Sequence, residues 1–240
     1  MIEARGVEVE FVSGWIKKQH TEVLKGFSMT AHDGVATGII GANGAGKTTF
    51  FRACAGLCKP REGIILIDGI NPAKEPEKAR RLIAVMPEKP SIPQEWTGLD
   101  ALKAAAAMRG IFGAAARSEI EKQVDRWKLE PFMNRLAVGY SRGQAVRVAL
   151  GREGIGTPRN LILDEPTAGL DFESAASVRA WIAELTASGR CVIVATHIVS
   201  EIETICRQIV GLRDGVAWSS EDARKWVSDA AMQIGQEERK

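Results

Sequence analysis

The amino-acid sequence predicts an α/β fold with a mostly parallel sheet, an antiparallel β part at the N-terminus and an inserted all-helical block. Three observations lead to this prediction. Short apolar runs without alternation recur along the chain, and helical patterns separate them, as is typical of a parallel sheet with helices packed on it. Alternating segments open the chain, and strand signals disappear between Glu88 and about Thr157. The 240 residues are enough for one such domain with a substantial core.

The first predicted strands alternate between apolar and other residues. Val7, Val9 and Phe11 fall on one face, and the run from Leu24 to Met29 repeats the pattern, which indicates antiparallel strands. The apolar run at 35–40 predicts a strand buried on both faces. Four further short buried strands are expected at 64–68, 82–86, 161–164 and 191–196.

The inserted block is predicted to consist of amphipathic helices. Thr97 is the expected N-cap of the alanine-rich stretch that follows it. The segments SEIEKQVDRWKL and GQAVRVALGRE have helical patterns too. We therefore expect one domain over 1–240, with a core formed by 1–87 and 158–240 and a helical subdomain at 88–157. Near the end, Asp214-Gly215 predicts a hairpin turn, and a helical tail is expected from Glu221.

Composition excludes several classes of protein. A net charge of +2, from 32 Lys and Arg against 30 Asp and Glu, gives no reason to expect a nucleic-acid partner. The four cysteines form no metal or disulfide framework, which favours small buried side chains in a reducing, cytoplasmic compartment. Cys54 and Cys58 are four apart and could share a helix face. No apolar window is long enough to span a membrane, so we expect a soluble chain.

A phosphate-binding loop is predicted at residues 41–48, which match GxxxxGK[ST] directly after a buried strand and before a helix. Glycines allow the backbone N–H groups to turn towards one centre, and the helix N-terminus adds positive charge. Lys47 is expected at the β- and γ-phosphates, and Thr48 at Mg²⁺. The residues expected around the phosphates are Gly41, Asn43, Gly44, Ala45, Gly46, Lys47, Thr48 and Thr49.

Two carboxylates end the predicted strand at 161–164. Parallel α/β sheets bind ligands at the carboxyl ends of their strands. Asp164 is therefore expected to hold Mg²⁺ indirectly, and Glu165 is free to act as the general base that polarises water. The phosphate loop and the acid pair together indicate hydrolysis of a nucleoside triphosphate.

Three further motifs resemble those of ABC ATPases, and the resemblance covers essentially the whole chain. Residues 140–144, YSRGQ, resemble the LSGGQ signature, with Tyr140 and Arg142 as departures. Residues 166–171, PTAGLD, resemble the D-loop, and Ala195-Thr196-His197 resembles the segment of the switch histidine. The family has a P-loop NTPase core with an inserted helical signature subdomain, which agrees with the pattern of elements.

The resemblance implies ATP and Mg²⁺ as ligands and a head-to-tail dimer in which each chain completes the site of the other. Ser141, Arg142, Gly143 and Gln144 would then lie at the ATP of the second subunit, with Ser141 as N-cap of the signature helix. His197 would bind the γ-phosphate, and Asp171 would link the two sites. Separate transmembrane permease subunits would place the dimer on the cytoplasmic face of a membrane.

Some assignments stay open. The family stacks an aromatic ring on adenine; Phe11 fits that role by register, Trp15 is its rival, and Phe11 as a core residue is the plain alternative. Glu88 stands where the family usually has the Q-loop glutamine, and it can still bind Mg²⁺ and water. Together with YSRGQ it resembles cassettes of ABC-2-type exporters.

Competing functions are a soluble ABC ATPase for iron–sulfur assembly or translation, and more distantly a kinase or GTPase. One cassette with balanced charge counts against the first, and the signature segment counts against the second.

Residues 89–96 are predicted to form part of a groove for a helix of the membrane partner, with Ile92 and Trp96 as anchors. Trp96 in the core of the subdomain is the alternative.

Overall fold

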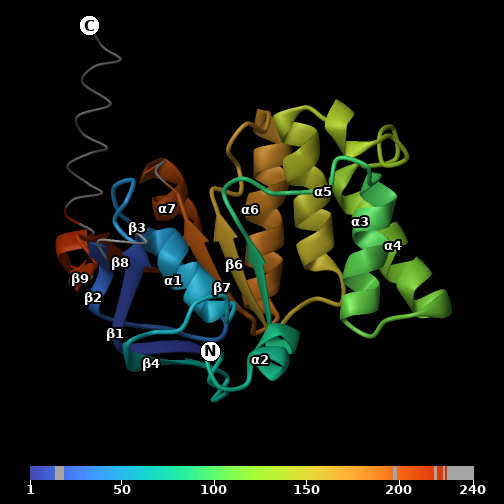
Figure 1. Cartoon of the computed structure of the whole chain (residues 1–240). Coiled ribbons are helices and arrows are strands. Elements are labelled where there is room, and N and C mark those ends of the chain that lie inside the picture. Colours follow the sequence, from blue (N-terminus) through green and yellow to red (C-terminus); the bar gives the residue numbers. More distant parts are fainter. Residues whose placement is uncertain (14–18, 197–198, 219–220, 224, 226–240) are drawn as a thin grey trace, which may run out of the picture.

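The structure is a computed structural model and describes residues 1–13, 19–196, 199–218, 221–223 and 225. Figure 1 shows two sheets on one side and a group of helices on the other. The strands are β1 (Ile2–Ser13), β2 (Gln19–Ala31), β3 (Ala36–Ile40), β4 (Glu62–Ile67), β5 (Ile83–Met86), β6 (Asn160–Asp164), β7 (Cys191–Ala195), β8 (Gln208–Arg213) and β9 (Val216–Trp218). The helices are α1 (Lys47–Cys54), α2 (Pro76–Leu82), α3 (Gly98–Met108), α4 (Gly113–Trp127), α5 (Arg142–Gly154), α6 (Phe172–Ala187) and α7 (Val199–Ile205), with a 3-10 turn at Ala137–Gly139.

The larger sheet has the strand order β5-β6-β7-β3-β8-β9. Its first five strands are parallel, and β9 is antiparallel to β8 across the predicted Asp214-Gly215 turn. Every residue of β3, β6 and β7 is buried, because helices or the second sheet cover both faces. The predicted α/β fold with a mostly parallel sheet is confirmed.

The smaller sheet has the order β2-β1-β4 and is antiparallel, as expected for the N-terminal part. The expectation for residues 64–68 was wrong in one respect, since β4 pairs with β1 and takes no place in the parallel sheet. Ile65 and Ile67 are buried while the residues before them are half-buried, so this strand has one covered face. Phe27 of β2 packs edge-on against Phe50 of α1, with ring centroids 4.9 Å apart, inside a core that α1 shares with both sheets.

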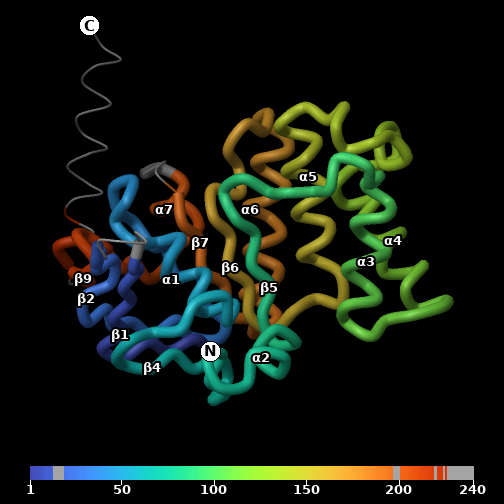
Figure 2. The backbone as a smooth tube through the Cα atoms, in the orientation of Figure 1, coloured from blue at the N-terminus to red at the C-terminus, as the bar shows by residue number. Residues whose placement is uncertain are grey.

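Helices α3, α4 and α5 form the inserted part, and the tube in Figure 2 shows them beside α6. Thr97 caps α3 and Ser141 caps α5, each with a capping box, so both predicted N-caps are confirmed. Trp127 of α4 packs edge-on against Trp181 of α6, with centroids 5.3 Å apart. The inserted helices therefore share one apolar core with the parallel sheet.

The cysteines are free, and Cys54, Cys191 and Cys206 are buried as expected. Cys58 is half-buried and lies beyond the end of α1. A shared helix face for Cys54 and Cys58 is therefore wrong, because Gly56 turns the chain with a φ of 68°. Within the described residues, no helix is long and apolar enough to cross a membrane. Most of the tail after Glu221 lies outside the described residues.

Candidate functional site

The loop between β3 and α1 has the glycines that its shape requires. A Cβ atom at Gly41 would come within 2.2 Å of the carbonyl oxygen of Leu212, so the loop could not pass β8 with any larger residue. Gly46 is the N-cap of α1 with a φ of 114°, a backbone conformation that L-residues rarely adopt. The first turn of α1 holds no acidic residue. Its N-terminus therefore offers unopposed positive partial charge to an anion.

Lys47 lies over this loop. Its ammonium group donates hydrogen bonds to the carbonyl oxygens of Gly41 and Ala42, the second over 3.2 Å. The backbone around it is accessible, because Ala42, Asn43 and Gly44 are exposed, as is Thr48 at the start of the helix. A positive charge, exposed loop backbone and a helix N-terminus thus lie together at the surface, an arrangement that suits a polyphosphate.

The acid pair lies at the carboxyl end of β6, beside this loop. Asp164 is 4% exposed and hydrogen-bonds to Thr48. Glu165 is 8% exposed and has a φ of 51°, in the left-handed region that few non-glycine residues occupy. Its N–H donates to the carbonyl of Ala195 over 2.7 Å, and its Oε2 accepts from Thr196 Oγ1 over 3.1 Å. The neighbouring strand β7 thus holds Glu165 in this turn.

Electrostatics around Asp164 show which groups share the site. Burial, together with the nearby carboxylates of Glu165 and Glu88, raises the pKa of Asp164 to about 6, although Lys47 and Thr48 act in the opposite direction. The sequence-predicted Lys47, Thr48, Glu88, Asp164 and Glu165 therefore lie together. Ionising Asp164 costs free energy because other carboxylates lie close to it. A cation bound among these carboxylates would lower that cost.

The donor set suits Mg²⁺ shared with a nucleotide. Carboxylate and hydroxyl oxygens are the ligands that Mg²⁺ prefers, and the ion is usually bound by one or two such groups plus phosphates and water. No cluster of three or more His, Cys, Asp or Glu side chains in the described part of the chain could hold a metal ion alone. Asp164 and Thr48, with Glu88 close by, fit the smaller protein share of such a site.

The start of α5 carries the signature segment. Ser141 Oγ accepts from the Gln144 N–H over 3.2 Å, and Gln144 Oε1 accepts from the Ser141 N–H over 3.0 Å. Arg142 and Gly143 lie against the turn at 166–171 of the same chain, since a Cβ at Gly169 would come within 2.9 Å of the Arg142 side chain. The capped helix start is exposed at Ser141 and Arg142. It can therefore be reached by a second molecule.

Asp171 ends that turn and is the N-cap of α6. Its Oδ1 accepts from the Ser174 N–H over 2.8 Å, and its Oδ2 accepts from Ser174 Oγ over 3.0 Å. These hydrogen bonds lower the pKa of the exposed Asp171 carboxyl, so the side chain is anionic at neutral pH. Sequence reasoning missed this capping role.

Phe11 is 41% exposed, and it does not share the buried face of Val7 and Val9. The pairing of β1 with β2 shifts register between Val9 and Glu10, which breaks the simple alternation. The core alternative for Phe11 is therefore wrong, and its ring is available at the surface. Trp15 and His197, the other two residues in open or implied roles, lie outside the described residues.

Sequence reasoning also missed a buried pair behind the acid pair. Thr167 Oγ1 donates to Glu201 Oε2 over 2.6 Å, and both side chains are buried. Glu201 also lies 3.8 Å from Arg179 of α6. This pair joins α7 to the turn that follows Glu165. The contact links residues 34 positions apart, so no local pattern in the sequence could have indicated it.

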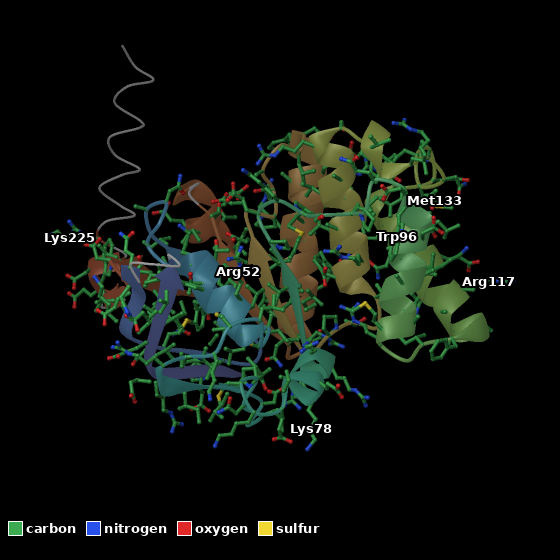
Figure 3. All side chains as sticks on the ribbon, viewed as in Figure 1. Arg52, Lys78, Trp96, Arg117, Met133 and Lys225 are labelled. Carbon is green, nitrogen blue, oxygen red and sulfur yellow. The ribbon has the colours of Figure 1, made fainter. Side chains whose placement is uncertain are left out.

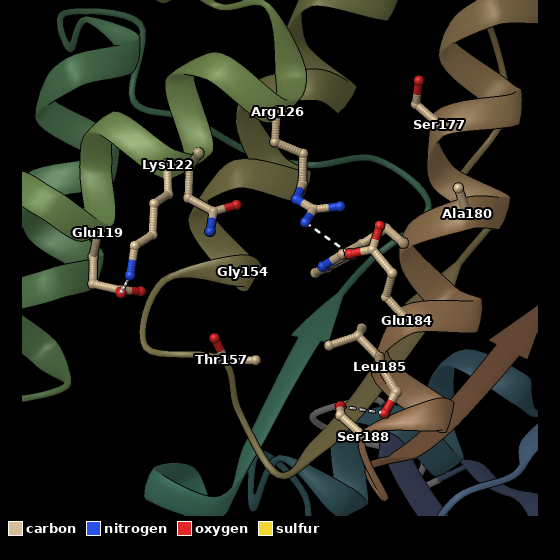
Figure 4. A pocket seen from close by; sticks show the side chains of 12 residues that line it. Glu119, Lys122, Arg126, Gly154, Thr157, Ser177, Ala180, Glu184, Leu185 and Ser188 are labelled. Carbon is tan, nitrogen blue, oxygen red and sulfur yellow. Dashed lines mark hydrogen bonds and ion pairs between the residues drawn. The ribbon is translucent and has the colours of Figure 1, made fainter.

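A cavity of about 790 Å³ lies elsewhere, between α4 and α6 (Figure 4). Both acidic and basic side chains line it, and Arg126 crosses to Glu184 over 2.8 Å. Lys128 makes a second link to Glu173 over 2.6 Å. Such exposed ion pairs contribute little stability, so α4 and α6 are joined here mainly through the Trp127–Trp181 contact. None of the phosphate-loop or acid-pair residues lines this cavity.

The loop, the acid pair and the helical insertion together define a cassette that binds and hydrolyses a nucleoside triphosphate. The profile of the ABC transporter family matches residues 24–168. The chain belongs to this family, and it is an ABC transporter ATP-binding subunit and an ATPase.

Individual relatives agree with this assignment. The ABC transporter ATP-binding protein NatA of Bacillus subtilis (strain 168) is 30% identical over 200 residues, which are 83% of this chain and 81% of NatA. The daunorubicin/doxorubicin resistance ATP-binding protein DrrA of Streptomyces peucetius is 31% identical over 204 residues, 85% of this chain and 62% of DrrA. The chain spans 32% of the probable multidrug ABC transporter ATP-binding protein YbhF of Escherichia coli (strain K12), at 32% identity over 186 residues, 78% of this chain.

Solved structures show the same fold. The ATP binding subunit of an ABC transporter superposes with a TM-score of 0.82 at 27% identity, covering 95% of this chain and 93% of that one. A dimeric bacterial ABC transporter cassette superposes with a TM-score of 0.83 at 25% identity, covering 91% and 97%. The P-loop core of the fold prediction is thereby confirmed.

Proposed function

We propose that this chain powers an exporter by hydrolysing ATP in a head-to-tail dimer on the cytoplasmic face of membrane-spanning partners. One observation carries the proposal. Lys47, Thr48, Asp164 and Glu165 lie together at the carboxyl ends of the parallel strands, and the capped start of the signature helix is exposed on the same chain. The phosphate loop and the acid pair form one half of an ATP site, and the N-terminus of α5 can supply the other half to a facing chain. A second copy of the chain can reach both.

Each residue at the sheet edge has a role in this reaction. Lys47 and the loop N–H groups bind the β- and γ-phosphates, and Thr48, Asp164 and Glu88 are the residues that would hold Mg²⁺. Magnesium supplies charge neutralisation on the phosphates when bound. Glu165 accepts a proton from the attacking water, and the backbone bond to Ala195 keeps its carboxylate directed to one place. His197 completes the γ-phosphate contacts, and the exposed Phe11 ring stacks on adenine.

The second copy supplies the remaining contacts. Ser141, Gly143 and Gln144 bring the N-terminus of α5 to the γ-phosphate of the facing chain, with the Arg142 guanidinium nearby, and Asp171 links the two sites. Capping fixes the Ser141 geometry before ATP arrives, which reduces the ordering cost of dimerisation. Residues 88–157 act as a subdomain that carries this helix, and the apolar core that they share with the parallel sheet fixes its place beside the ATP-binding core.

Membrane partners dock on residues 89–96. Trp96 is 40% exposed, and the exposed Leu136 and Val138 extend its apolar surface. The Ala137 N–H donates to the Trp96 carbonyl over 2.8 Å, so the two apolar segments lie side by side. Figure 3 shows Trp96 on the helical side of the molecule. An amphipathic helix of a permease subunit would bind this surface through its apolar face.

The choice of an exporter rests on the similarity to DrrA and YbhF, whose names describe drug resistance and multidrug transport. A soluble ABC ATPase for assembly or translation is the second candidate. The relatives described above are transporter ATP-binding proteins, which does not favour it.

The decisive experiment traps the dimer. Glu165→Gln keeps the shape of the side chain but removes the base, so ATP should bind while hydrolysis falls by about 10² to 10⁴. The variant should then elute as an ATP-dependent dimer in size-exclusion chromatography. Adding Ser141→Arg should abolish the dimer by placing bulk and charge at the interface. Hydrolysis by Glu165→Gln at the wild-type rate would refute the assignment of the base.

A further inference from the structure

The hydroxyl group of Tyr140 joins three segments that are distant in the sequence. Its oxygen accepts a hydrogen bond from the N–H of Gly98, the first residue of α3, over 2.8 Å. The same oxygen lies 3.1 Å from the carbonyl oxygens of both Phe132 and Arg135. A hydroxyl has one proton, so it donates to one of these carbonyls at a time and accepts from Gly98 throughout. The ring packs edge-on against Phe132, with centroids 5.5 Å apart.

Tyr140 immediately precedes the cap of the signature helix. Ser141 is the N-cap of α5, so whatever fixes Tyr140 also fixes where that helix begins. Backbone contacts link the same segments. The Leu99 N–H donates to the Met133 carbonyl over 3.0 Å, and Thr97 forms an isolated β-bridge with Leu136. The start of α3 and the approach to α5 are therefore tied together. The side-chain contribution to that tie is the Tyr140 hydroxyl.

Gly98 is shaped for this contact. A Cβ atom there would lie 2.8 Å from the Tyr140 oxygen, closer than real Cβ contacts allow, and 3.2 Å from a methyl of Val148. A glycine at the first position of a helix has no propensity advantage. Its presence is explained by the approach of the hydroxyl to the Gly98 N–H, which otherwise lacks a partner within its own helix.

We propose that the Tyr140 hydroxyl is a positioning group that locks the start of α5 to the start of α3, so that Ser141 and Gly143 meet the ATP of a second copy. This inference rests on the proposed dimer. Tyr140 touches no nucleotide itself; it acts through the helix that it precedes. Where the resembling signature has leucine, this chain has a side chain that can form the lock.

The experiment uses the full chain with Glu165→Gln, so that ATP-dependent dimers accumulate. Tyr140→Phe keeps the ring on Phe132 and removes only the hydroxyl. We expect the dissociation constant of the ATP-bound dimer, measured by sedimentation velocity, to rise about tenfold, the effect of losing one well-formed hydrogen bond. ATP binding to the monomer, measured with a fluorescent ATP analogue on dilute protein, should stay within about twofold, because the phosphate loop is untouched.

Thr97→Val is the matched control. It removes the capping hydroxyl that serves Asp100 at the same helix start, one residue from Gly98, but leaves Tyr140 and its three partners in place. It should lower thermal stability without weakening the dimer. A general loss of stability at the start of α3 is thereby separated from a loss of position at α5.

A second variant reaches the same contact from the other side. Gly98→Ala displaces the Tyr140 oxygen and should weaken the dimer similarly, although alanine favours the helix. In the Tyr140→Phe background it should add little further weakening, because the clashing oxygen is gone. This variant decides the question if Tyr140→Phe does not fold.

The outcomes distinguish a failure of the Tyr140 inference from a failure of the proposed ATP-dependent dimer. If Glu165→Gln alone stays monomeric with saturating ATP, the proposed dimer is wrong and the inference falls with it. If Glu165→Gln dimerises and Tyr140→Phe dimerises equally well, the inference alone is wrong. The same holds if Thr97→Val weakens the dimer as much as Tyr140→Phe, since a general loss of stability at the start of α3 would then account for both effects.

Discussion

Replacing Asp164 by asparagine should make the ligand-free protein more stable while abolishing its chemistry. Asp164 is almost completely buried beside Glu165 and Glu88, and its pKa is raised from 3.8 to about 6. Ionising this carboxyl at neutral pH therefore costs the folded state free energy. Asparagine has the same shape and keeps an oxygen that can accept a hydrogen bond from Thr48, but it carries no charge.

The magnitude follows from the two pKa values. A raised folded-state pKa means that the folded protein holds the proton more tightly than the unfolded chain, so stability is lost as pH rises from about 4 to about 6. At about 1.36 kcal/mol per pH unit, the difference between 3.8 and about 6 amounts to about 3 kcal/mol. The gain in Asp164→Asn should be about 0.5 kcal/mol at pH 4 and about 3 kcal/mol above pH 7.

The assay is urea unfolding followed by circular dichroism, with EDTA and without nucleotide, from pH 4 to pH 8. Asp171→Asn is the control, because hydrogen bonds from Ser174 lower the pKa of that carboxyl and its replacement should bring no gain at pH 7. ATP hydrolysis with Mg²⁺ should be lost in Asp164→Asn. A stability difference that is independent of pH, or a less stable variant at pH 8, would refute the reasoning.

Three further predictions concern other parts of the chain. Phe11→Ala should weaken ATP binding in calorimetry by about 1 to 3 kcal/mol through lost stacking, and more than Trp15→Ala does; the reverse ranking would transfer the role to Trp15. Trp96→Ala should stop transport in membranes while basal ATPase activity persists, and parallel loss of both would contradict docking at this surface. Thr167→Val should lower the free energy of unfolding by about 1.5 to 3 kcal/mol, because buried Glu201 loses the hydrogen bond from Thr167 and keeps only the longer contact with Arg179 among those described above. An unchanged urea midpoint would show that water replaces that donor.

The phosphate loop and the acid pair could be predicted because their chemistry is local in the sequence. Each follows a buried parallel strand, and all such strands end at the same edge, so Lys47 and Asp164 had to approach one another. The caps at Thr97 and Ser141 are local for the same reason, since a cap bonds three residues ahead.

Contacts between distant segments could not be predicted from the pattern. Tyr140 meets Gly98 across 42 positions, and Thr167 meets Glu201 across 34, so neither leaves a periodic signal. The prediction that placed residues 64–68 in the parallel sheet was wrong, because an apolar run does not reveal which strand it pairs with. Phe11 left its expected face because the register of β1 shifts after Val9, and a bulge of this kind has no signature in the alternation.

The strand order of the parallel sheet also constrains the order in which parts of the fold can form during translation. Central strand β3 pairs through Ala36 with Val192 of β7 and through Thr37 with Gln208 of β8. On the ribosome, the phosphate loop must therefore wait for β7 and β8 before its own strand gains neighbours, whereas β1, β2 and β4 can pair early. Until β7 and β8 emerge, the apolar β3 has no partner strand. The nascent chain thus carries an unpaired apolar strand, a site at which chains can aggregate, until those two strands emerge, and the ATP site can form only after them.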